Sequence, residues 1–216
     1  MKHLIVYDLD GTLLDTSQEI VQANAYVLSH LGASRERLEA VQTFVGHGMR
    51  DLVAWGLKRD DPALVEEAGA LFAAYYARCA GGHSRLYPAA LHVLEYFKDR
   101  AQAALTDRPN PFANELMETL GISRYFVDIV TGDSPYPRKP DPAGLRALIA
   151  EAEVVPEDTL LIGDSPLDIQ AGRRAGVFTV AVSHGMHPVS ALRAAAPDAL
   201  VDDLVQLLQL ARQNGW

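Results

Sequence analysis

The spacing of hydrophobic residues divides the chain into three parts. A short predicted strand comes first, a stretch with helical spacing follows, and the longer remainder alternates between strand-like and helix-like spacing. Residues 4–7 read Leu-Ile-Val-Tyr, and turn-forming residues follow at once. An apolar run of this length and composition predicts a strand that is buried on both faces. From residue 17 to about residue 80 the apolar positions recur at helical spacing and predict helices. The first helix is expected to begin at residue 17 and to end at Gly32, and the second to run from its cap Ser34 to about residue 43. A third is expected after the break at 45–48. A fourth, longer one is expected to start at 61–62 and to stop at the glycines 81–82.

The remaining chain alternates between the two periods, which is the pattern of a parallel sheet with helices on both faces. The predicted strands are 101–105, 127–130, 159–163, 177–182 and 199–201, and the predicted helices are 88–100, 111–120, 141–152, 166–175 and the C-terminal segment. The expected fold is therefore a Rossmann-like, doubly wound α/β sheet. Its core comprises residues 1–15 and 84–216, and the all-helical segment 16–83 is inserted into it.

Composition and charge narrow the possible partners. The chain has 216 residues and a formal net charge of −9, which argues against a nucleic-acid groove and requires any phosphate site to carry its own local positive charge. Cys79 is the single cysteine, so no disulfide framework is expected. No apolar run is long enough to span a bilayer and the first residues do not resemble a signal peptide, so a cytoplasmic protein is the prediction. The sequence leaves open whether it is a monomer or a homodimer.

Two carboxylates leave the end of the first predicted strand together. Asp8 and Asp10 stand two residues apart, and side chains at that spacing project the same way from an extended chain. Gly11 then allows the backbone to turn, and Thr12 supplies a hydroxyl. Two like charges about 4 Å apart repel by roughly 4 kcal/mol at an effective dielectric near 20. The pair therefore calls for a cation, a shared proton, or both, although an isolated Asp-Gly is more often only a turn.

Other polar residues follow later predicted strands. Thr106 and Asp164 come directly after strands, and Lys139 lies in a loop after another. Open parallel sheets bind ligands beyond the carboxyl ends of their strands, near the point where strand order reverses. Each residue alone has an ordinary explanation, because loops are polar wherever they are exposed. Their joint placement predicts one site.

The order of these motifs resembles that of the haloacid dehalogenase superfamily of phosphatases. The string from Asp8 to Thr12 resembles its nucleophile motif, Thr106 its second motif, Lys139 its third, and residues 163–168 (Gly-Asp-Ser-Pro-Leu-Asp) its fourth. The resemblance covers nearly the whole chain, with the helical insert in the place of the family's mobile cap. Residues 45–48, Lys139-Pro140 and Asp164-Ser165 look like the phosphoglycolate phosphatase group.

The resemblance implies a role for each acid. Asp8 is the expected nucleophile, which forms an aspartyl-phosphate and splits one difficult step into two. Asp10 is the expected general acid and base. Mg²⁺ is the expected cofactor, held by Asp8, the backbone carbonyl of Asp10, and Asp164.

The same resemblance assigns the surrounding groups. Lys139 and the Thr106 hydroxyl, with backbone N–H groups near Leu9, Asp10 and Asp107, are expected to offset the charge on the phosphoryl oxygens. Asp168, Ser165 and Thr12 are expected around the site, and Asp168 either contacts the metal's waters or orients Lys139.

One position departs from the pattern of the phosphoglycolate phosphatase group, which usually reads Thr-Asn-Lys where this chain has Thr106-Asp107-Arg108. Asp107 adds a carboxylate beside a dianionic substrate. That is unfavourable unless Arg108 pairs with Asp107 or Asp107 points away. Leu9, Asp107 and Arg108 are the expected substrate-binding residues of the core, so this departure affects substrate affinity and identity more than the type of reaction.

The insert is expected to close over the substrate and exclude water. His47 and Arg50, beside the Gly46–Gly48 break, are the candidates that would contact the leaving group, with a solvent-exposed His47 as the alternative. The string His184-Gly185-Met186-His187 is interpreted as a turn after a strand and not as a metal site.

The predicted function is a Mg²⁺-dependent phosphomonoester hydrolase acting on 2-phosphoglycolate or a similar small phosphorylated metabolite. A sugar phosphomutase is the first alternative, and Asp10 argues against a dehalogenase, which does not need a second acid. A receiver-like phosphoacceptor or binding module is the alternative from another class. Such a module would have no use for the insert, and it would stop after one phosphate per chain.

Overall fold

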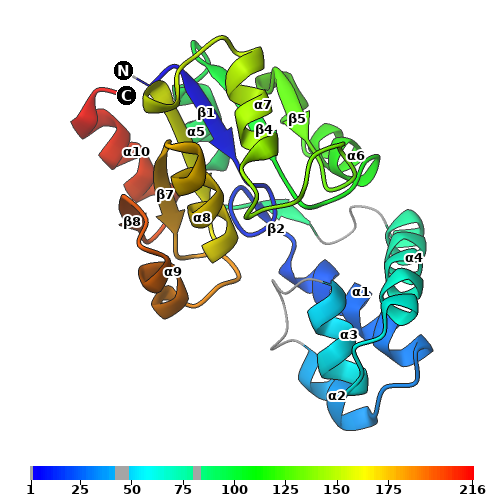
Figure 1. The fold of residues 1–216 in the computed structure, drawn as a ribbon. Coiled ribbons are helices and arrows are strands. Elements are labelled where there is room, and N and C mark those ends of the chain that lie inside the picture. Colours follow the sequence, from blue (N-terminus) through cyan, green and yellow to red (C-terminus); the bar gives the residue numbers. More distant parts are fainter. Residues whose placement is uncertain (1, 42–48, 80–83) are drawn as a thin grey trace. The chain divides into compact units, whose positions relative to one another are not determined.

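The computed structural model describes residues 2–41, 49–79 and 84–216 (Figure 1). The chain divides into two compact units. One comprises Met1–Asp15 and Arg85–Trp216, and the other comprises Thr16–Ser84. The insertion predicted for residues 16–83 therefore coincides with the second unit to within one residue, and its role as a cap stays a prediction.

The first unit is built on a six-stranded parallel sheet. In spatial order the strands are β5 (Asp128–Val130), β4 (Ala101–Leu105), β1 (Leu4–Tyr7), β6 (Thr159–Gly163), β7 (Phe178–Val182) and β8 (Ala199–Val201). The chain builds outward from β1 to β4 and β5, and then returns to the other side of β1 to add β6, β7 and β8. Strand order therefore reverses between β1 and β6, and the doubly wound fold is confirmed.

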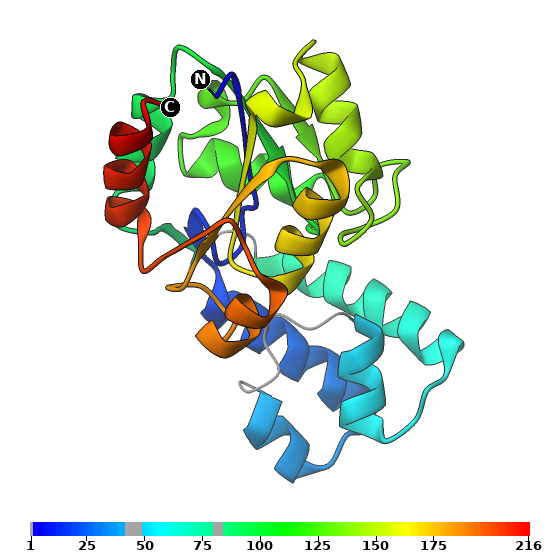
Figure 2. The ribbon, with the colours of Figure 1, turned by 60° about the vertical axis from the view of Figure 1, so that its left-hand side comes forward.

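Helices cover both faces of this sheet (Figure 1, Figure 2). One face carries α5 (Ala90–Tyr96), α6 (Phe112–Thr119) and α10 (Leu204–Asn214), and the other carries α7 (Ala143–Glu151) and α8 (Pro166–Ala175). Strand β1 contributes alternate residues to the two cores: Ile5 and Tyr7 face the first, Leu4 and Val6 the second. All four side chains are fully buried, and burial of each aliphatic one stabilises the fold by about 1.5–3 kcal/mol.

Most predicted elements occur where the pattern placed them, with differences at the ends. Helix α5 is shorter than the predicted 88–100 at both ends: it begins only after Ala89, which has a left-handed backbone (φ 66°), and it ends at Tyr96. The pattern missed α9 (Val189–Ala195), which packs Leu192 against Ile169 and Ala181. It also missed the short 3-10 helices η2 (Ser123–Tyr125) and η3 (Pro156–Asp158).

A two-stranded antiparallel ladder joins the two chain segments that lead into and out of the second unit. Its strands are β2 (Leu14–Asp15) and β3 (Arg85–Leu86), with Leu14 opposite Leu86 and Asp15 opposite Arg85. The Arg85 guanidinium also donates to Asp15 Oδ2 at 2.7 Å. We call this ladder the clasp. Strands of two residues leave no alternation to detect in a sequence, so the clasp was not predicted.

Among the described residues of the second unit, every regular element is a helix. Its helices are α1 (Ser17–His30), α2 (Arg35–Ala40), α3 (Met49–Leu57) and α4 (Pro62–Cys79). Ser34 caps α2 as predicted, its side chain accepting from the Arg37 N–H. The predicted end of this helix near residue 43 lies outside the described residues. Across the described parts of both units, no helix combines the length and apolar character needed to cross a membrane.

Candidate active site

Asp8 and Asp164 meet at the reversal of strand order. Asp8 follows β1 directly, Asp164 follows β6, and these strands are hydrogen-bonded neighbours. The Asp8 N–H donates to the Ile162 carbonyl at 2.9 Å, which fixes the level of one strand end against the other. Both carboxylates are almost completely buried. Two acids from distant parts of the chain thus lie together in a buried position at the carboxyl edge of the sheet.

A third acid completes a cluster that could hold a metal ion. One carboxylate oxygen from each of Asp8, Asp164 and Asp168 lies within 4.8 Å of the others. An all-oxygen donor set rich in carboxylates suits a hard divalent cation, and Mg²⁺ favours one or two carboxylates with the remaining positions taken by water or phosphate oxygens. The donor chemistry therefore fits the predicted cofactor.

Asp164 is held tightly by its neighbours. The Thr12 hydroxyl donates to Oδ1 at 3.3 Å, and the backbone N–H of Met186 donates to Oδ2 at 2.7 Å. A Cβ placed on Gly11 or on Gly185 would stand 2.3 Å from Asp164 side-chain atoms. Only glycine leaves room at both positions, and Gly11 also has a left-handed φ of +85°.

The loop after β7 therefore belongs to the site. Besides the Met186 contact, His187 Nδ1 lies 3.7 Å from Asp164 Oδ2, and His184 Nε2 donates to the Thr12 carbonyl at 3.0 Å. This segment is a turn, as interpreted from the sequence, but no contact between it and Asp164 was predicted. The rule that ligands bind beyond the carboxyl ends of parallel strands could have identified this turn as part of the site, because the turn follows a strand at the same edge of the sheet.

Lys139 bridges two of the acids. Its Nζ donates to Asp8 Oδ1 at 2.8 Å and to Asp168 Oδ1 at 2.7 Å, with only 5% of the lysine side chain exposed. Burial alone would lower the pKa of Lys139, but Asp168, Asp8 and Asp107 outweigh it and raise that pKa well above its usual value. Burial likewise raises the pKa of Asp8, and the Lys139 ammonium opposes that rise. The Lys139 ammonium is therefore the nearest group that favours the ionised form of Asp8.

Asp168 is engaged through both carboxylate oxygens. Oδ1 accepts from Lys139, while Oδ2 accepts from the Ser165 N–H at 3.0 Å and from the Ser165 hydroxyl at 2.6 Å. The Asp168 N–H in turn donates to Ser165 Oγ, so the two residues form a capping box at the start of α8. Of the two roles considered for Asp168, these contacts favour the orientation of Lys139.

Arg108 forms an ion pair with Asp10, a contact that the sequence did not predict. Nε donates to Asp10 Oδ2 at 3.1 Å and Nη2 donates to Oδ1 at 2.6 Å, which makes a bidentate pair. Asp107, considered as the partner of Arg108, instead accepts the backbone N–H of Lys139. Burial raises the pKa of Asp107, with Lys139 opposing. The group that mainly offsets the charge of Asp107 is therefore Lys139 and not Arg108.

The remaining expected residues divide between this site and other places. Thr106 is buried directly after β4, and its hydroxyl oxygen accepts the Arg108 N–H at 3.1 Å. The Leu9 side chain lies in the core, and its carbonyl accepts three N–H groups of the turn that follows. Arg50 belongs to the second unit, where it pairs with Asp60 at 2.7 Å on the exposed surface. His47 lies outside the described residues.

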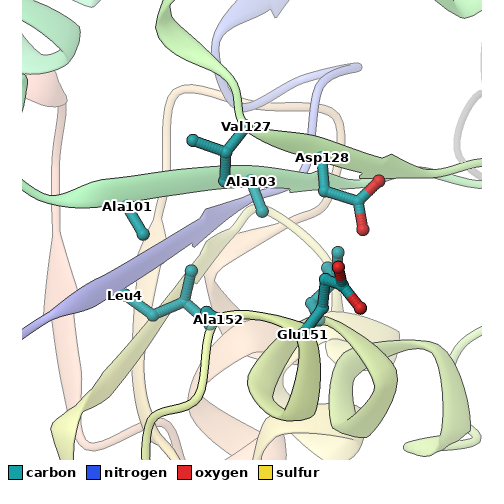
Figure 3. A pocket seen from close by; sticks show the side chains of 8 residues that line it. Leu4, Ala101, Ala103, Val127, Asp128, Glu151 and Ala152 are labelled. Atoms are coloured by element: carbon teal, nitrogen blue, oxygen red, sulfur yellow. The ribbon is translucent and has the colours of Figure 1, made fainter.

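A pocket elsewhere in the first unit carries no such chemistry. It is lined by the beginnings of β1, β4 and β5 and by the end of α7, at the amino edge of the sheet (Figure 3). Its polar side chains are the acids Asp128 and Glu151, among alanine, valine and leucine. An acidic pocket of this kind does not suit an anionic substrate.

The chain is similar to known phosphatases in sequence and in fold. Residues 5–182 match the sequence family of haloacid dehalogenase-like hydrolases. The chain is 34% identical to a phosphoglycolate phosphatase of Photobacterium profundum, covering 96% of this chain and 95% of that one. It is equally identical to a phosphoglycolate phosphatase of Pseudomonas putida, covering 96% and 79%.

A solved structure shows the same fold. The crystal structure of a predicted phosphoglycolate phosphatase from Haemophilus somnus matches with a TM-score of 0.84 at 26% identity, covering 97% of this chain and 98% of that one. The family match covers most of the chain, including the four motifs and the helical insertion. The chain therefore belongs to the haloacid dehalogenase-like hydrolases.

Proposed function

We propose that this chain, a phosphatase of that family, hydrolyses 2-phosphoglycolate or a similar small phosphomonoester with the aid of Mg²⁺. The observation that carries the proposal is the buried cluster of Asp8, Asp164 and Lys139 at the reversal of strand order. It combines a carboxylate nucleophile, oxygen ligands for a cation and a fixed positive charge. Phosphoryl transfer depends mostly on such positioning and electrostatics.

In this proposal the Asp8 carboxylate attacks phosphorus, the bond from phosphorus to the ester oxygen breaks, and an aspartyl-phosphate forms. Asp10 donates a proton to the leaving alkoxide and then takes one from the attacking water, which releases phosphate and regenerates Asp8. Lys139 and the Thr106 hydroxyl offset charge on the phosphoryl oxygens. A Mg²⁺ ion held by Asp8, the Asp10 carbonyl and Asp164 would supply further positive charge at those oxygens.

The surrounding contacts support this division of roles. Ser165 holds Asp168, Asp168 holds Lys139, and Lys139 reaches Asp8, so a chain of hydrogen bonds aims the ammonium at the nucleophile. Thr12 and the Met186 N–H hold Asp164 in the same way. Groups that are oriented before substrate arrives need no reorganisation during the reaction.

The substrate is inferred from the relatives. The two curated relatives are named phosphoglycolate phosphatases, and one of them aligns with this chain over nearly the full length of both. Asp10 supports hydrolysis over dehalogenation, and the family supports turnover over a receiver that stops after one phosphate. A sugar phosphomutase would convert its substrate without releasing phosphate, and the test below separates the two.

The test is phosphate release from 2-phosphoglycolate and a panel of other small phosphoesters, with Mg²⁺ and with chelator. We expect multiple turnovers with Mg²⁺ and none with chelator. Asp8→Asn should abolish release. Asp99→Asn is the matched control, because Asp99 is exposed in the turn before β4, at the opposite edge of the sheet. Absence of turnover with every ester, or full activity in Asp8→Asn, would refute the proposal.

A further inference from the structure

Arg108 and Asp10 form an ion pair that is largely buried, although Asp10 is the residue expected to contact the substrate. Only 6% of the arginine side chain and 19% of the aspartate side chain are exposed. Both carboxylate oxygens of Asp10 accept from the guanidinium fork, at 2.6 and 3.1 Å. Charge-assisted, bidentate pairs of this kind are among the strongest side-chain hydrogen bonds.

The proposed reaction conflicts with this arrangement. Asp10 has to turn one of its oxygens toward the ester oxygen of the leaving group, and the fork holds both. Moving Asp10 away would break both of these charge-assisted hydrogen bonds at a nearly buried guanidinium, which is unfavourable. The exchange becomes favourable when another anion accepts from the fork in place of Asp10.

We propose that Arg108 binds a carboxylate of the substrate on the leaving-group side of the phosphoester, and that this exchange releases Asp10 toward the ester oxygen. The inference rests on the proposed function and deepens it. It makes Arg108 the residue that selects phosphomonoesters whose alcohol carries a carboxylate close to the ester oxygen. 2-Phosphoglycolate is the smallest ester of that description.

The chemistry of the two cations in the site supports this assignment. Arginine presents a planar fork that matches the two oxygens of a carboxylate, whereas lysine is a compact point charge. Lys139 is already committed to the buried pair Asp8 and Asp168, so it stands beside the nucleophile. Arg108 stands beside Asp10, the residue assigned to the leaving group. The fork therefore lies where a leaving-group carboxylate would be recognised.

The backbone of residues 106–108 is held in place, and this limits how far the Arg108 guanidinium can move. The Arg108 N–H donates to the Thr106 hydroxyl oxygen, and the Gly132 backbone packs so closely on the Asp107 carbonyl that a Cβ on Gly132 would lie 2.1 Å from it. The backbone of residues 106–108 is thus held from both sides. An exchange of partners by Arg108 requires only movement of its side chain.

The test compares two esters of nearly equal size, 2-phosphoglycolate and the uncharged analogue 2-hydroxyethyl phosphate. The quantity measured is the ratio of their kcat/KM values in the Mg²⁺-loaded protein of 216 residues. We expect Arg108→Gln to lower this ratio about 100-fold, as loss of one partner of a buried, hydrogen-bonded charge pair does. Arg108→Lys keeps the charge without the fork and should lower the ratio by a smaller factor.

Arg146→Gln is the matched control. Arg146 is exposed on α7 and donates to the Arg174 carbonyl near the C-terminal end of α8, whereas Asp168 and the site lie at the N-terminal end of that helix. Its ratio should equal that of the unmodified protein. If Arg108→Gln fails to fold, as judged by circular dichroism, Arg108→Lys alone decides the question.

A second measurement tests the exchange without 2-phosphoglycolate. Glycolate, the free leaving alcohol, should inhibit hydrolysis of 2-hydroxyethyl phosphate by the unmodified protein. This inhibition should weaken about 100-fold in Arg108→Gln. A residue with a merely structural role would not change the inhibition by glycolate selectively.

The outcomes separate the two proposals. If the unmodified protein hydrolyses neither these esters nor any other, the proposed function fails. If it hydrolyses both esters and Arg108→Gln leaves their ratio and the glycolate inhibition unchanged, only the assignment of Arg108 is overturned.

Discussion

Replacement of Lys139 by methionine measures how much the buried ion pairs of Lys139 contribute to the stability of the protein. The Lys139 ammonium lies 2.8 Å from Asp8 and 2.7 Å from Asp168, and 9% or less of each of the three side chains is exposed. Two unit charges 2.8 Å apart attract by roughly 6 kcal/mol at an effective dielectric near 20. Desolvation cancels part of this attraction, and removing one partner of a buried pair typically costs about 3–5 kcal/mol.

We therefore expect Lys139→Met to lower the free energy of unfolding by about 3–5 kcal/mol at pH 7. The assay is urea unfolding in the presence of chelator, so that a bound metal does not replace the lost charge. The loss should shrink as the pH falls. Burial raises the pKa of Asp8 and the variant lacks the lysine that opposes this rise, so protons neutralise the stranded carboxylate more readily.

Two further variants complete the experiment. In Lys139→Met with Asp168→Asn, the loss should be smaller than the sum of the two single losses by about 1–3 kcal/mol, because the residues interact directly. Lys98→Met is the control: its pair with Glu95 is about half exposed on each side, and exposed pairs of this kind contribute little to stability. A loss below about 1 kcal/mol for Lys139→Met, or strict additivity, would refute the reasoning.

Three other substitutions test separate contacts. Asp107→Asn should lower the KM for phosphomonoesters, because it removes a carboxylate near the dianion; an unchanged or raised KM contradicts this. Since burial raises the pKa of Asp107, the same variant should unfold at higher urea at pH 7, an advantage that disappears when acid protonates the carboxyl. Gly11→Ala should cost about 1–2 kcal/mol for its left-handed backbone and lower kcat about 100-fold by displacing Asp164; kcat within threefold of the unmodified protein would refute this. Ser165→Ala should destabilise the protein by about 1 kcal/mol in thermal unfolding through loss of the α8 cap, and an unchanged midpoint would be inconsistent with that role.

The sequence predicted the positions of the acids better than the partners of the cations. Asp8 and Asp164 could be placed together because strand ends meet at one edge of a parallel sheet. The contact between Arg108 and Asp10 could not be predicted, because it depends on the side-chain direction set by the turn at residues 106–108. Adjacency along the chain suggested Asp107 as a partner, while the fold brings a residue 98 positions away.

The loop 184–187 shows the same limit in another form. Its residues follow a strand, but only the packing of Gly185 against Asp164 reveals that the backbone itself is a contact of the site. Glycines at such positions leave no periodic signal. The strands of the clasp were missed because two residues are too few for a pattern to repeat.

The clasp sets the distance between the two ends of the inserted segment. Residues opposite each other in an antiparallel ladder have Cα atoms roughly 4.5–5.5 Å apart, so the chain leaves the first unit at Asp15 and returns at Arg85 through almost the same point. A segment of any length whose two ends meet at that separation could be spliced in without stretching the sheet. The ladder thus fixes where the inserted segment has to begin and end, and a change in the length of that segment need not move the acids at the strand ends.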